Sequence, residues 1–142
     1  MSRENVEWVR TLIETANASG WDPKVAASFV HPEGRMYSAP DFPGQDVYVG
    51  REEIEAFVGE WISTFDDLEW KVEELVDLDD RVLLLARQVG KSKTTGAAAD
   101  WHFGTIFSDF RDGMFAESRH FMDWRSALEA AGLDDRLQSN PQ

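Results

Sequence analysis

The sequence contains no cysteine, no long apolar run and few basic residues, and each shortage excludes a class of protein. Without Cys among its 142 residues, the chain cannot form a disulfide framework, a thiolate zinc site or a cysteine nucleophile. No apolar run approaches the ~20 residues that a membrane-spanning helix needs. The first residues include acidic groups and lack the apolar segment of a signal peptide, so we expect a cytoplasmic protein.

The charge balance is strongly acidic. The chain has 14 Lys and Arg residues against 27 Asp and Glu residues, which gives a net charge of −13. Binding to nucleic acid or to an anionic membrane depends on basic side chains that neutralise phosphates. We therefore expect neither partner, and we interpret the acidity as a contribution to solubility.

The apolar content is sufficient for a core. Hydrophobic residues make up 42% of the chain and aromatic residues 12%, in a length that corresponds to one domain. We predict a single domain over residues 1–133 and a flexible tail over residues 134–142.

Helical spacing dominates the first half of the chain. Apolar residues recur at intervals of three and four over residues 3–19 and 51–65, which predicts two amphipathic helices. Asp22-Pro23 predicts the start of a short helix between them, which should end at His31-Pro32. Residues 35–39 read as a short strand, followed by an irregular loop over residues 40–45.

The second half alternates with a period of two, which is typical of strands. Asp112-Gly113 is a strong hairpin signal. Gly132 should end a short closing helical turn. The expected strands cover residues 68–72, 81–89, 97–110 and 114–124, and the closing turn covers residues 126–131.

Helices followed by a run of antiparallel strands indicate the α+β class. We predict a cone-shaped, strongly bent and mostly antiparallel sheet that wraps around the helices. The mouth of such a cone is a natural place for a ligand.

The end of the chain carries a family signature. Residues 123–133 read DWRSALEAAGL, and this run resembles the ending of SnoaL-like proteins. These are small domains of the NTF2-like superfamily, a cystatin-like α+β barrel fold that also includes ketosteroid isomerases, polyketide cyclases and limonene epoxide hydrolases. The resemblance implies a pocket, no cofactor, and a homodimer formed through the outer face of the sheet.

Asp123 and His120 are the first candidates for catalysis. In the polyketide cyclases that the chain resembles, an Asp three residues after a His is the general base, and Asp123 stands at that position. Desolvation would raise the pKa of such a carboxyl group and improve it as a base. The alternative for Asp123 is capping of the closing helical turn. His120 could stabilise an oxyanion or move a proton, or it could be a half-buried His that is satisfied by a backbone carbonyl.

Arg87 is the third catalytic candidate. It follows a mostly apolar run and needs a carboxylate partner, which Asp123 or Glu117 could supply. The epoxide hydrolases that the chain resembles have an Asp two residues after this Arg, and this chain has Val89 there. We therefore discount epoxide hydrolysis. The alternative for Arg87 is a surface ion pair.

The comparison with ketosteroid isomerases fails at individual positions. Ser38 stands where those enzymes have the basic Asp, with Asp41 three residues later. Leu12 stands at the position of their oxyanion-hole tyrosine, and Thr105 lies near that of the neutral carboxylic acid. A serine cannot abstract a proton without a base of its own, so that isomerisation mechanism is not expected.

Aromatic residues on one long strand and one helix could line a pocket. Trp101, Phe103 and Thr105 share one strand face, and Trp61 and Phe65 from the helix before it would cap the same interior. A shift of one residue would turn the strand residues to the other face, and a simple core is the alternative reading. Ser38 and Met122 complete the predicted ligand-binding set.

No metal site is expected, because the three His residues lack the spacing of metal ligands.

Two candidate functions remain from the sequence. The first is a cofactor-free acid–base catalyst of the cyclase or isomerase type, with Asp123 as its base and an apolar carbonyl compound as its substrate. The second is a non-catalytic module that binds an apolar small molecule or forms a dimer.

Overall fold

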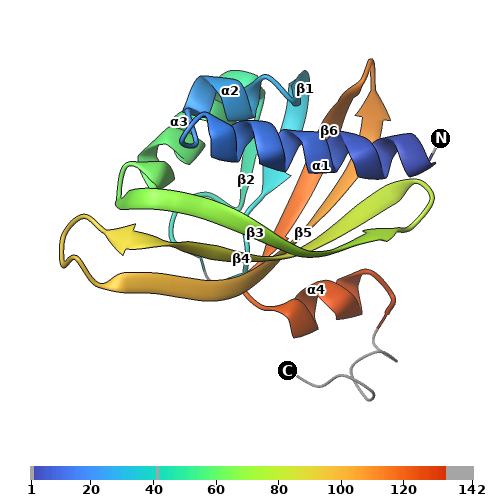
Figure 1. Ribbon diagram of the computed structural model, residues 1–142. Helices are drawn as coiled ribbons and strands as arrows, with labels where there is room; N and C mark the ends of the chain where they lie inside the picture. Colours follow the sequence, from blue (N-terminus) through green and yellow to red (C-terminus); the bar gives the residue numbers. More distant parts are fainter. Residues whose placement is uncertain (1, 41, 134–142) are drawn as a thin grey trace.

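The computed structural model describes residues 2–40 and 42–133. Three helices come before the long strands, and a fourth follows them (Figure 1). The helices are α1 (Ser2–Ala18), α2 (Pro23–Ala27), α3 (Arg51–Ile62) and α4 (Trp124–Ala130). The strands are β1 (Val30–Tyr37), β2 (Val47–Val49), β3 (Phe65–Asp77), β4 (Arg81–Ser92), β5 (Ala98–Arg111) and β6 (Met114–Phe121).

The six strands form one curled sheet in the order β2-β1-β6-β5-β4-β3. Neighbouring strands are antiparallel except β1 and β6, which run parallel. The predicted meander of four long strands and the α+β class are confirmed. The sheet is curled but not closed, since β2 and β3 form its two edges.

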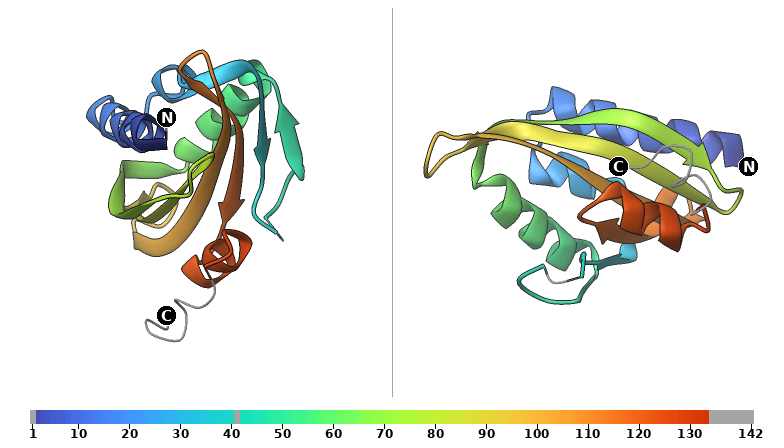
Figure 2. Two further views of the ribbon diagram at one scale, coloured as in Figure 1. Left: turned by 90° about the vertical axis from the view of Figure 1, so that its right-hand side faces the viewer. Right: turned by 90° about the horizontal axis from the view of Figure 1, so that it is seen from below.

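The helices divide between the two faces of the sheet. Figure 2 shows α1, α2 and α3 on the concave side and α4 on the opposite side. The alternation along β4 explains this division, because Val82 and Leu84 belong to the core under the first three helices. Leu83 and Leu85 belong to a second core with α4. A strand whose two faces are both covered reads as a continuous apolar run, as this part of β4 does.

Tight turns and one close approach set the geometry at the end of the sheet. Asp112 and Gly113 both have positive φ angles, 52° and 72°, as the predicted hairpin turn requires. Gly104 on β5 lies under α4, where an added Cβ atom would lie 2.5 Å from the Cβ of Ala127. Gly132 ends α4 with a φ of 78°, and the N–H of Leu133 donates to the carbonyl of Leu128, as in a Schellman ending.

Several boundaries differ from the sequence prediction, among them the end of β6 at Phe121 rather than Trp124. Strand β1 begins at Val30 and includes His31-Pro32, which we expected to end the second helix. Pro32 is tolerated because the pairing of β1 with β6 is irregular between Val30 and Arg35, where a missing N–H interrupts no regular ladder. Helix α3 ends at Ile62 rather than Phe65.

The short strand β2 was not predicted, because three residues give too little alternation to recognise. The predicted tail, residues 134–142, lies outside the described residues. Among the described helices, none is long and apolar enough to cross a membrane.

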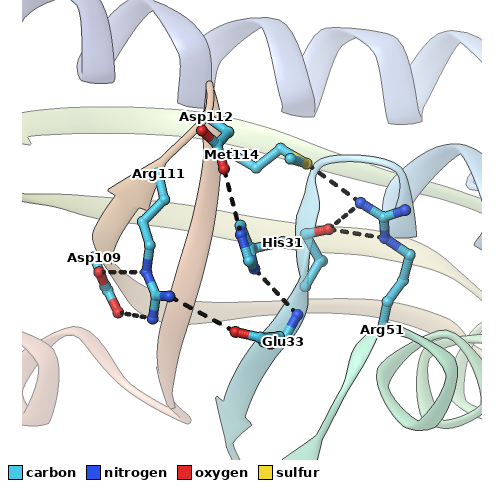
Figure 3. Close-up of polar contacts among 8 residues, drawn as sticks. His31, Glu33, Arg51, Asp109, Arg111, Asp112 and Met114 are labelled. Atoms are coloured by element: carbon cyan, nitrogen blue, oxygen red, sulfur yellow. Dashed lines mark hydrogen bonds and ion pairs between the residues drawn. The ribbon is translucent and has the colours of Figure 1, made fainter.

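A polar cluster ties the start of β1 to the β5–β6 hairpin and to α3 (Figure 3). The Nε2 atom of His31 lies 3.6 Å from a carboxylate oxygen of Asp112 in the hairpin turn. The Nδ1 atom of His31 accepts a hydrogen bond from the backbone N–H of Glu33. Arg51, the first residue of α3, donates through Nε to the carbonyl of Val30 at 2.8 Å. These contacts hold the irregular part of β1 in place and fix one end of the concave face.

Candidate functional site

The concave face holds an apolar cavity of about 150 Å³. It lies between the sheet and the helices α1, α2 and α3, whose residues Leu12, Ala26 and Ile54 contribute to its wall. Its lining includes no Asp, Glu, Lys or Arg among the described residues. The aromatic lining residues are Trp21, Phe42, Phe57, Trp61, Trp70, Trp101, Phe103, Phe107, Phe115 and Phe121.

The aromatic rings pack on one another rather than filling the space at random. The ring centroids of Trp21 and Trp70 are 4.4 Å apart, as are those of Trp70 and Phe103. Trp61 contacts Trp101 edge-on at 6.1 Å. Such tilted and edge-on pairs are the favoured arrangements of aromatic side chains, so the rings hold one another in place around the cavity.

Among the described residues, four polar side chains contribute to the lining: Ser38, Gln88, Ser118 and His120. The hydroxyl of Ser38 donates to the carbonyl of Gln45 at 2.8 Å. Gln88 is only 3% exposed, and its Oε1 accepts hydrogen bonds from the indole N–H groups of Trp70 at 3.0 Å and Trp61 at 3.4 Å. These bonds anchor the Gln88 amide in the cavity wall.

His120 occupies the floor of the cavity on β6. Its Nδ1 lies 3.0 Å from the hydroxyl of Thr105, and its Nε2 lies 3.3 Å from the hydroxyl of Ser118. Burial disfavours the charged imidazolium and lowers the pKa of His120 from 6.5 to about 4. The ring is therefore neutral at pH 7. Its partners are two side-chain hydroxyls and not the backbone carbonyl considered from the sequence.

Asp123 lies just beyond the end of β6 and is exposed. It is the N-cap of α4, where one carboxylate oxygen accepts from the backbone N–H of Ser126 at 2.7 Å. The other oxygen accepts from the Ser126 hydroxyl at 3.2 Å. The cavity lining includes His120 and Met122 but not Asp123. The structure therefore gives Asp123 the capping contacts considered from the sequence, and its catalytic role stays a prediction.

Arg87 lies on the outer face of the sheet. The carboxylates that it pairs with differ from those that we expected. It forms a two-point contact with Asp100, through Nε at 3.0 Å and a second nitrogen at 2.5 Å, and it lies 3.7 Å from Glu73. The expectation that Asp123 or Glu117 is its partner is wrong. The hydrogen bond between Arg87 and Asp100 raises the pKa of Arg87. The same hydrogen bond lowers the pKa of Asp100.

The structure resolves the strand register that the sequence left open. Trp101 and Phe103 face the cavity, whereas His102 faces outward and stacks on Trp124 at 4.2 Å. Thr105 is fully buried and is not a lining residue. Its hydroxyl contacts the lining residue His120. Phe65 is not a lining residue either; it packs on Trp61 and Trp101.

Sequence reasoning missed Gln88, Trp21 and Trp70 as lining residues. Gln88 lies on the same face of β4 as Val82, Leu84 and Ala86, but the continuous apolar run over residues 82–86 shows no alternation that would mark this face. No local pattern marks Trp21, which follows the end of α1 and has a positive φ of 61°.

The fold and its cavity place the chain in the NTF2-like class of curled α+β sheets. The chain belongs to the SnoaL-like domain family, whose model matches residues 9–118. The match ends before His120 and before the run 123–133 on which the resemblance was based. No curated protein sequence matches the chain.

Solved structures show the same architecture. A putative SnoaL-like polyketide cyclase from Jannaschia sp. CCS1 is 27% identical, with a TM-score of 0.71, over 91% of this chain and 92% of that chain. A phenazine biosynthesis-related protein from Pseudomonas aeruginosa is 21% identical, with a TM-score of 0.70, over 93% of this chain and 83% of that chain. A hypothetical protein with a ketosteroid isomerase-like fold from Catenulispora acidiphila, in complex with trimethylamine, is 16% identical, with a TM-score of 0.66, over 85% of this chain and 90% of that chain.

Proposed function

We propose that this protein binds an apolar small molecule in the cavity of its concave face. The observation that carries the proposal is an aromatic cavity of about 150 Å³ whose described lining has no Asp, Glu, Lys or Arg. Removal of apolar surface from water is the main driving force that such a site offers. The trimethylamine complex of the Catenulispora protein supports the idea that small molecules enter this fold.

The proposal can be tested by NMR titration of the ¹⁵N-labelled protein with toluene. We expect chemical-shift changes at the indole N–H groups of Trp61 and Trp70, which lie in the cavity wall. Val58→Phe should fill the cavity and abolish these changes. Val49→Phe is the matched control, because Val49 is 52% exposed and does not line the cavity. Equal shifts in the wild type and in Val58→Phe would contradict the proposal.

A second candidate function is cofactor-free acid–base catalysis of the cyclase or isomerase type. The observation that favours it is the titratable side chain in the lining, His120, with Ser118 beside it. The resemblance assigns the role of base to Asp123, whose described contacts are those of a helix cap. Once a ligand is found, product analysis of Asp123→Asn and His120→Asn separates these assignments. Loss of turnover in His120→Asn alone supports His120, and unchanged turnover in both variants excludes both residues as the base.

A homodimer through the outer face of the sheet also remains a proposal. On that face α4 packs against β4, β5 and β6, and the guanidinium of Arg119 lies 4.0 Å above the ring of Tyr37. Light scattering over a range of protein concentrations tests it. A mass near twice 16.1 kDa is the expected result, and a monomer at all concentrations contradicts it.

A further inference from the structure

The cavity wall contains one amide whose orientation is fixed by its neighbours. An indole N–H group can only donate a hydrogen bond, so the two indoles of Trp61 and Trp70 must face the oxygen of the Gln88 amide and not its nitrogen. The –NH₂ group of Gln88 therefore points away from both indoles. If the amide were flipped, its –NH₂ group would face the two indole N–H groups. None of these donors would then have an acceptor.

The nitrogen of this amide has no partner. Nε2 of Gln88 is the one buried side-chain nitrogen or oxygen without a hydrogen-bond partner in the described part of the chain. A buried donor that is left unpaired is costly, and native proteins rarely keep one without a reason. Gln88 lines the cavity, and its Nε2 has almost no accessible surface, so a bound molecule can supply the acceptor after a small movement of the surrounding side chains.

The other polar groups of the lining are already engaged. Both ring nitrogens of His120 lie against hydroxyl groups, and the hydroxyl of Ser38 donates to a backbone carbonyl. A carboxylate ligand would find no positive side chain in the described lining, and an ammonium ligand would find no negative one. A neutral oxygen acceptor is the ligand group that satisfies Gln88 without burying an unpaired charge.

The size of the cavity limits the rest of the ligand. An apolar cavity of about 150 Å³ is of the size that holds a benzene molecule in another protein. One aromatic ring, or two fused rings after small side-chain movements, therefore fits without opening the fold.

We propose that the cavity takes a neutral one- or two-ring molecule whose carbonyl oxygen accepts a hydrogen bond from Nε2 of Gln88, which makes Gln88 a specificity-determining residue. This inference rests on the proposed function, because it requires that small molecules enter the cavity. It adds the chemical class of the ligand and the side chain that recognises it.

The test uses two probes of nearly the same shape, acetophenone and α-methylstyrene, in which a C=O group is replaced by C=CH₂. Dissociation constants are measured by NMR titration for the wild type, for Gln88→Met and for the control Gln45→Met, a matched change outside the cavity lining. Water favours the ketone over the hydrocarbon, so the absolute constants are not compared. The measured quantity is the ratio of the two constants in each protein, because solvation of the probes cancels between proteins.

We expect Gln88→Met to reduce the preference for acetophenone by about 3- to 10-fold relative to the wild type, the value of one hydrogen bond to a neutral group. Gln45→Met should leave the ratio unchanged. In the wild type, acetophenone and not α-methylstyrene should move the side-chain ¹⁵N–H resonances of Gln88 downfield. This second measurement does not depend on the variant, so it decides the matter if Gln88→Met does not fold.

The possible failures are distinguishable. If both probes bind with the same ratio in all three proteins and the Gln88 amide resonances do not respond to the ketone, the inference about Gln88 is overturned and the apolar cavity stands. If neither probe binds the wild type, both the inference and the proposed function are overturned. Tighter binding of phenyltrimethylammonium than of acetophenone would overturn the neutral-acceptor assignment in favour of a cation site.

Discussion

Replacement of His120 by Asn should make the free energy of unfolding less sensitive to a decrease in pH. In the folded protein burial lowers the pKa of His120 from 6.5 to about 4. Between these pH values the unfolded chain binds a proton that the folded chain does not bind. The free energy of unfolding must therefore fall as the pH decreases through this window.

The expected size follows from the same values. One pKa unit corresponds to about 1.4 kcal/mol, so a decrease from 6.5 to about 4 sets an upper value of about 3 kcal/mol. The residue as a whole is of intermediate exposure, so solvent screening brings the expected effect to about 2–3 kcal/mol. Asn can keep a hydrogen bond to Thr105 but does not titrate.

The assay is urea denaturation of the wild type and of His120→Asn at several pH values between 7.5 and 4. Titration of the many carboxylates is common to both proteins and cancels in the difference. We expect the wild type to lose about 2–3 kcal/mol more than the variant across this range. Parallel curves for the two proteins would falsify the account of a buried neutral His120.

Three further predictions concern the outer side of the sheet. Asp123→Ala should cost about 1 kcal/mol in urea denaturation, because the N–H of Ser126 loses its acceptor, and it should leave toluene binding unchanged; a loss of binding would contradict the capping role. Gly104→Ala should destabilise by about 1–3 kcal/mol through overpacking, and adding Ala127→Gly should restore stability; a double variant as unstable as the single one would refute this contact. Arg87→Met should leave the thermal midpoint unchanged within error, because the ion pair with Asp100 is solvent-exposed, whereas a large decrease would show a structural role.

The fold could be predicted because its signals are local and strong. The four long strands follow from alternation, and the turn at Asp112-Gly113 follows from two residues that tolerate positive φ. The boundaries that were wrong involve tertiary effects. Strand β1 continues through Pro32 because its irregular pairing with β6 needs no N–H there, and sequence periodicity carries no information about such a bulge.

The site was predicted less well, because its geometry depends on where strands end. His120 and Asp123 are three residues apart and point to opposite sides, as they would in a regular strand. His120 lines the cavity, and Asp123 caps α4 just beyond the end of β6 at Phe121. The partners of Arg87 come from β3 and β5, and the strand register that brings Asp100 and Glu73 to it cannot be read from one strand alone. Neither the place of Gln88 in the cavity wall nor its two indole partners could be found from β4 alone, because the continuous apolar run over residues 82–86 does not show which face is which.

The most direct test of the central claim is a crystal structure of the protein soaked with iodobenzene, with the iodine located by anomalous scattering. The account predicts an anomalous peak inside the cavity, among the rings of Trp61, Trp70 and Trp101, and its absence in Val58→Phe crystals treated in the same way. Iodine peaks found only on the outer surface, with the cavity of the wild type unchanged, would contradict the claim that this protein binds apolar small molecules on its concave face.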